Sequence, residues 1–204
     1  MSNVLGPIHY WLYGKIEFQN GLVERLSDLI IQKKYDDGIL SDMEKKYGVT
    51  EKGRLEDRIN LSDIHGWLQA EIAASEKRLA FLVTSMAAVH PECMSDIMNI
   101  AYEYGQSRKL SGGKSIEEVY KCLDDLLLNG MPCDRVNTLV SQSRSEIVWK
   151  QNVDIHAPYW EAVQGDVRYY YDIRERLAAG ILKDSGFFYK QLKHQTFAVA
   201  MEVR

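Results

Sequence analysis

The sequence predicts an all-α protein, a bundle of six to eight helices forming a single domain over residues 1–204, with a sub-boundary near 109–114. Apolar residues recur at steps of three and four along nearly the whole chain, which is the period of an amphipathic helix. No segment shows the strict alternation of a half-buried strand, and no Asn-Gly or Asp-Gly pair joins two apolar runs. With 46% hydrophobic and 26% charged residues, the chain can bury a core without disulfides.

In the first half, a long helix is predicted from Pro7 to about Ile30, because proline suits the first helical turn. A short helix follows over residues 38–47, and the polar stretch 48–60 is expected to be a connection. Ser62 and Asp63 then supply a cap for a second long helix that ends before Pro91.

In the second half, Ser115 and Glu118 form the spacing of a capping box, which predicts that a helix begins there. Breakers such as Gly112-Gly113 separate the other periodic stretches. The helices expected in this half cover residues 91–108, 115–128, 133–149, 166–181 and from 186 onward.

Charge and hydropathy limit the classes of partner. The chain has 25 Lys and Arg against 29 Asp and Glu, a net charge of −4, and no basic arm, so we expect no nucleic-acid binding. No run approaches the ~18–20 apolar residues of a membrane span, so no membrane partner is expected. The first residues lack the pattern of a signal peptide, which favours a cytoplasmic protein.

A histidine motif opens both long helices. Residues 8–16 read IHYWLYGKI and residues 64–72 read IHGWLQAEI, and IHAPYWEAV at 155–163 is a partial third copy. At 100° per residue, His9 and His65 share a face with the apolar stripes of their helices. If the two helices run parallel, with a crossover through residues 36–61, both histidines lie at one end of the bundle.

This pattern predicts an internal histidine-lined site for a metal or a small ligand, with no reaction specified. A neutral imidazole is a metal ligand, so a transition metal such as zinc or iron is the candidate cofactor. The expected metal ligands are His9, His65, His156 and Glu161. The expected ligand-binding residues are Trp11, Trp67, Gln69, Glu76 and Trp160.

Two other interpretations stay open. In one, the histidines are purely structural and the protein is a homo-oligomeric interaction module. Seven Met and twelve Tyr favour a homodimer, because both residue types are frequent in the cores of interfaces. In the other, Cys133 at a helix start is the nucleophile of a cysteine enzyme. The sequence does not decide whether the protein is an enzyme.

The three cysteines, Cys93, Cys122 and Cys133, are predicted to be unpaired thiols. Their odd number and wide spacing are typical of a chain from a reducing compartment rather than of a disulfide framework. Thiol titration of the denatured, unreduced protein should therefore count three thiols. A count of one would show that two of them form a bridge.

Overall fold

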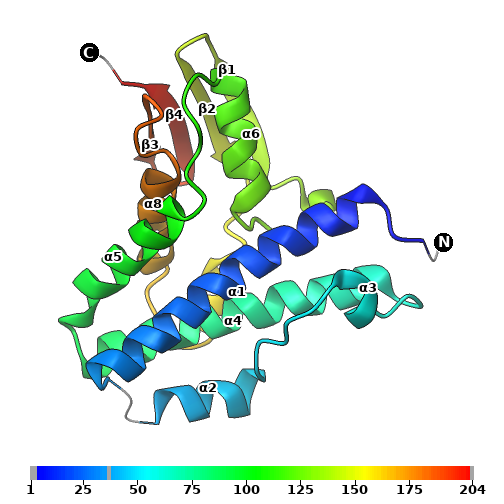
Figure 1. The fold of residues 1–204 in the computed structure, drawn as a ribbon, viewed down its shortest axis with the longest axis vertical. Coiled ribbons are helices and arrows are strands. Elements are labelled where there is room, and N and C mark those ends of the chain that lie inside the picture. Colours follow the sequence, from blue (N-terminus) through cyan, green and yellow to red (C-terminus); the bar gives the residue numbers. More distant parts are fainter. Residues whose placement is uncertain (1–3, 36–37, 203–204) are drawn as a thin grey trace.

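The structure is a computed structural model that describes residues 4–35 and 38–202. It combines helices with a four-stranded antiparallel sheet, so the all-α prediction is wrong (Figure 1). The helices are α1 (Pro7–Lys33), α2 (Ile39–Tyr47), α3 (Leu55–Arg58), α4 (Ile64–Val89), α5 (Cys93–Gln106), α6 (Ile116–Leu126), α7 (Ala157–Glu161) and α8 (Arg168–Ile181). A single 3-10 turn covers Pro132–Asp134. The strands are β1 (Asn137–Gln142), β2 (Glu146–Gln151), β3 (Phe187–Lys193) and β4 (Thr196–Met201).

The error lies in the helices expected over 133–149 and from 186 onward, which are two β-hairpins. In β2 the residues Ile147, Trp149 and Gln151 alternate toward the interior, and their β-branched and aromatic neighbours favour a strand. The β1–β2 turn contains no glycine. The Ser143 hydroxyl closes it instead, by accepting from the backbone N–H of Glu146. In the β3–β4 turn, Gln195 takes the left-handed conformation with φ of 55°. Neither turn carries the usual hairpin signal.

The two long helices, α1 and α4, pack side by side and in the same direction. Helices α2 and α3 form the crossover that a parallel pair needs, as the sequence predicted (Figure 1). Arg78 of α4 fixes this crossover, because its guanidinium donates to the carbonyls of Tyr47, Gly48 and Val49 at 3.0 Å each. The first turns of α1 and α4 therefore lie at one end of the molecule.

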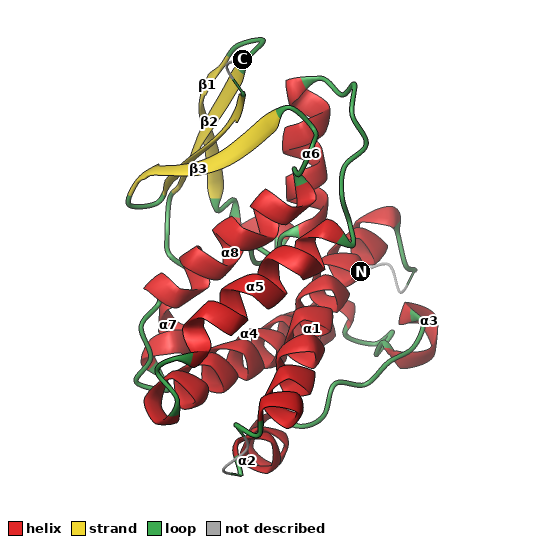
Figure 2. Cartoon of the chain, turned by 60° about the vertical axis from the view of Figure 1, so that its left-hand side comes forward, coloured by secondary structure: helices red, strands yellow, loops and turns green. Residues whose placement is uncertain are grey.

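The sheet has the strand order β1-β2-β4-β3, and every neighbouring pair is antiparallel. Two local hairpins thus meet through β2 and β4, with Trp149 opposite Phe197 in the register. Helices α7 and α8 lie between the hairpins in the chain. Figure 2 shows the sheet at one end of the helical layer, beside α6 and above α8.

One large apolar core joins the helices to the inner face of the sheet, through buried residues such as Leu26, Leu82, Ile173, Trp149 and Phe197. A smaller core lies under the first turns of α1 and α4, where Leu12, Leu68, Leu55 and Met131 pack. The loop after α6 contributes to the smaller core and also leads into β1. It therefore lies at the junction between the helical layer and the sheet.

The long helices also bury polar side chains, among them Lys15, Gln19, Asn20, Ser75, Glu76 and Arg78. Buried polar groups need partners inside the protein, so these residues are candidates for a functional site.

In the ranges 4–35 and 38–202, no helix has the length and apolar character that crossing a bilayer requires.

Helices α5 and α8 touch at their backbones through two glycines. A Cβ on Gly180 would overlap the carbonyl oxygen of Tyr102 and lie 2.8 Å from the backbone nitrogen of Gln106. A Cβ on Gly105 would overlap the carbonyl oxygen of Leu177 in the same way. The close crossing of these helices therefore requires glycine at both positions.

We predict that Gly180→Ala lowers the free energy of unfolding by at least about 2 kcal/mol, since backbone has to move to admit the methyl group. Gly14→Ala on α1 is the matched control, because nothing lies within 4 Å of a Cβ there. It should raise the free energy of unfolding by ~0.5–1 kcal/mol, the helix propensity of alanine over glycine. Urea unfolding of both variants measures the two effects, and equal effects would contradict the close crossing.

Candidate functional site

The structure brings His9 and His65 together, as the parallel arrangement of their helices predicted. Their ring centroids are 5.8 Å apart with the planes tilted by 54°. Both rings line an apolar hollow of about 210 Å³, together with Leu12, Leu68 and Cys133. This hollow lies over the smaller core, at the first turns of α1 and α4.

His9 is held in one tautomer by the start of its own helix. The backbone N–H of Gly6 donates to His9 Nδ1 over 2.9 Å, and the backbone N–H of His9 donates to the carbonyl of Gly6 at 3.0 Å. Since Nδ1 accepts, the proton of the neutral ring lies on Nε2. Neither nitrogen then offers a lone pair, and a metal ligand needs one. The first-turn histidine of α1 serves to cap the helix.

The predicted metal site is not formed. In the part of the chain that the structure describes, no three His, Cys, Asp or Glu side chains gather in a group that could hold a metal ion. His156 lies apart from the pair formed by His9 and His65, buried against α8, and Glu161 is exposed at the end of α7. The zinc or iron expected from the histidine motif therefore has no ligand set among the described residues.

His156 instead forms a buried pair with Glu76. Its Nδ1 lies 3.1 Å from Glu76 Oε1, and the two side chains are 0% and 2% exposed. The ring stacks on Tyr170 with centroids 3.8 Å apart. The carboxylate of Asp154 fixes the loop below, because it accepts from the backbone N–H groups of His156 and Ala157.

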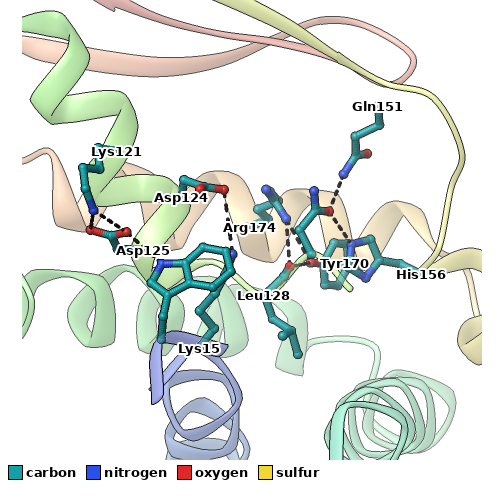
Figure 3. Close-up of polar contacts among 11 residues, drawn as sticks. Lys15, Lys121, Asp124, Asp125, Leu128, Gln151, His156, Tyr170 and Arg174 are labelled. Atoms are coloured by element: carbon teal, nitrogen blue, oxygen red, sulfur yellow. Dashed lines mark hydrogen bonds and ion pairs between the residues drawn. The ribbon is translucent and has the colours of Figure 1, made fainter. Parts of the chain in front are cut away.

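A chain of hydrogen bonds continues from His156 toward the sheet (Figure 3). His156 Nε2 lies 3.4 Å from Asn129 Oδ1, which also accepts from Gln151 Nε2 at 2.9 Å. Gln151 Oε1 in turn accepts from the hydroxyl of Tyr171 at 3.2 Å. Both ring nitrogens of His156 are therefore used inside the protein, which makes this histidine structural.

Arg174 of α8 is a buried cation near this chain, with 5% of its surface exposed. One of its terminal nitrogens donates to the carbonyl of Leu128 and to the hydroxyl of Tyr170, at 3.3 and 3.1 Å. Its Nε has no hydrogen-bond partner. No carboxylate of the described residues lies within 4 Å of its nitrogens, so its charge has no ion pair there.

Lys15 of α1 is another buried charged group at this junction, with 2% of its surface exposed. Its Nζ lies 3.7 Å from Asp124 Oδ1 on α6 and 4.0 Å from the centroid of the Trp11 ring (Figure 3). The pKa of Lys15 is lowered to about 8, mainly by burial and with a contribution from the positive charge of Arg174, while Asp124 opposes the shift. Asp124 itself is 40% exposed, so it compensates the buried charge only in part.

Lys15 and Asp124 line a cavity of about 250 Å³, which we name the Lys15 pocket. Its polar lining comes from Lys15, Tyr120, Asp124, Asn129, Arg135 and Asn137, and the rings of Trp11 and Pro132 add apolar walls. Asp124 also lines a small hollow beside the Lys15 pocket that reaches Arg174. The pocket therefore combines one buried cation, Lys15, with the exposed Arg135, one carboxylate and two amide side chains in a space suited to a molecule of a few heavy atoms.

The predicted ligand-binding residues divide between this pocket and other places. Trp11 lines the pocket, and its indole N–H donates to Asp125 at 2.8 Å. Trp67 packs against Tyr13, and Glu76 belongs to the buried pair with His156. Trp160 is fully buried in the large core, and Gln69 is exposed on α4.

Lys15, Asp124, Asn129 and Arg174 were missed by the sequence analysis. A signal for Lys15 was present, because Leu12, Lys15, Gln19, Leu22 and Leu26 follow helical steps of three and four, which places the lysine on a buried stripe. Asn129 and Asp124 come together with it only through tertiary structure.

We predict that Lys15→Met stabilises the protein at pH 7. The shift of the lysine pKa from 10.5 to about 8 corresponds to about 3 kcal/mol, so the free energy of unfolding should rise by ~1–3 kcal/mol. Between pH 8 and 10.5 the unfolded chain keeps a proton that the folded protein has lost, so wild-type stability rises with pH. The advantage of the variant should therefore shrink as the pH rises through this window.

Urea unfolding at pH 7 and pH 10 measures the difference. Lys121→Met is the control, since Lys121 is 72% exposed on α6 and its replacement should change stability by less than ~0.5 kcal/mol. A Lys15→Met variant that is less stable than wild type at pH 7 would show that the ammonium is well compensated in its pocket.

Comparison with known proteins adds no assignment. No family model matches the chain, and no match was found among curated proteins or solved structures. The function is therefore argued from the geometry and charge of the Lys15 pocket itself.

Proposed function

We propose that the protein binds a small organic anion, a carboxylate, in the Lys15 pocket. The observation that carries this proposal is the buried ammonium of Lys15, which lines the pocket with only a partial partner. Lys15 is 2% exposed, and the only carboxylate within 4 Å of its Nζ among the described residues is the half-exposed Asp124. A buried charge without a full partner costs stability, and a bound anion would supply that partner.

The lining of the pocket supports a single negative charge on the ligand. Arg135 stands among the lining residues with Lys15 and Asp124, so the lining itself carries one net positive charge. The side chains of Asn129 and Asn137 add amide groups to the lining. The volume of about 250 Å³ limits the ligand to a few heavy atoms.

The proposal keeps the small ligand predicted from the sequence but moves it from the histidines to Lys15. The histidine-lined hollow is apolar, and His9 is engaged by the cap of α1. The homodimer stays a prediction and does not depend on this site.

The test is titration calorimetry with acetate, lactate and pyruvate, with ethylamine as the probe of opposite charge. We expect the carboxylates to bind and ethylamine not to bind. Lys15→Met should weaken the carboxylates at least tenfold, since a hydrogen bond to a charged group contributes ~1.5–3 kcal/mol. Affinity should also fall as the pH rises through about 8, because Lys15 loses its proton there.

Lys121→Met serves as the control for a lost surface charge. Because the Lys121 side chain is 72% exposed, the variant should bind the carboxylates within about twofold of the wild-type affinity. Binding that is equal in wild type and Lys15→Met would overturn the proposal. An absence of heat with all three carboxylates would overturn it as well.

A further inference from the structure

The side chain of Lys15 has the surroundings of an amine nucleophile. It is buried, its ion pair with Asp124 is long at 3.7 Å, and the face of Trp11 covers it at 4.0 Å without providing a hydrogen-bond acceptor. Removal from water disfavours the charged ammonium, and the neutral amine is the form that attacks a carbonyl. The amine borders a cavity of about 250 Å³, so a small molecule can reach it.

We infer that Lys15 forms an imine with a small 2-oxo acid bound in the Lys15 pocket. This inference rests on the proposed binding of a carboxylate and adds the chemical class of the ligand. A 2-oxo acid carries its carbonyl next to a carboxylate, and the pocket offers a nucleophile and a second cation, Arg135, in the same lining. Surface lysines such as Lys121 have no such pocket, since Lys121 is 72% exposed and paired with Asp125.

The step balances without any other reactant. The lone pair of Nζ attacks the ketone carbon, and the carbonyl oxygen becomes the hydroxyl of a carbinolamine after a proton moves from nitrogen to oxygen. Loss of that hydroxyl as water, with a second proton from nitrogen, leaves the C=N bond. Asp124, 3.7 Å from Nζ, is placed to accept each proton from the nitrogen and return it to the leaving oxygen.

The experiment is reductive trapping of the full chain with pyruvate and sodium cyanoborohydride. The hydride reduces the C=N bond and water supplies the proton on nitrogen, so one reduced adduct stays attached and is located by peptide mass mapping. We expect Lys15 to be modified at least tenfold faster than Lys121. The rate should increase as the pH rises toward 8, because the neutral fraction of Lys15 grows over this range.

Two controls separate imine formation from binding. Lactate has the carboxylate but no ketone, so it should bind without being trapped and should protect Lys15 from pyruvate. Lys15→Arg keeps the charge and removes the nucleophile, so it should bind lactate but give no adduct in the pocket. Lys121→Arg should be modified at Lys15 as fast as wild type.

Each failure has a distinct meaning. If calorimetry shows Lys15-dependent binding of pyruvate but trapping at Lys15 is no faster than at Lys121, the imine is wrong and carboxylate binding stands. If neither binding nor trapping is seen, both proposals are overturned. Lactate protection is measured on the wild-type protein, so the test does not depend on the folding of a variant.

Discussion

The need to satisfy charged and polar groups away from water shapes the centre of this protein. Glu76, His156, Asn129 and Gln151 form one hydrogen-bonded line from α4 to β2, and Tyr170 stacks on its histidine. A buried polar group that loses its hydrogen-bond partner is costly, so such a line fixes the position of every element that contributes to it. The helical layer, the loop after α6 and the sheet are thus held in one arrangement.

Lys15 stands next to this line and differs from it in one respect. Both ring nitrogens of His156 and the side chain of Gln151 find partners inside the protein, although Glu76 Oε2 has none, whereas Lys15 has a long contact with a half-exposed carboxylate and a cavity beside it. A residue that lowers stability and opens onto a cavity is typical of a functional position, since function is where proteins depart from their stability optimum. A ligand in the Lys15 pocket would complete the partial compensation that Asp124 gives to the buried ammonium.

The sequence predicted the long helices of the first half, because their caps and apolar stripes are local features, but it left open whether the two helices run parallel. It failed for the two hairpins, whose turns are closed by a serine hydroxyl and by a left-handed glutamine rather than by glycine. It predicted that His9 and His65 face a common space, and their rings do lie together. It did not predict the groups that surround either ring. Lys15 lies on a predicted helix, whereas Asp124, Asn129 and Arg174 come from other segments, and only the tertiary fold brings them to it.

The strand order β1-β2-β4-β3 also has a consequence for how the chain acquires its structure. Each hairpin joins neighbours in sequence, but the ladder of β2 with β4 pairs Trp149 with Phe197 across the whole of α7 and α8. Closing so long a loop costs entropy before any contact is gained, and such non-local pairing slows folding. Docking of α8 on α5 through Gly105 and Gly180 shortens the effective loop. Helix α8, docked on α5, thus acts as an internal template on which the two hairpins of the sheet come together.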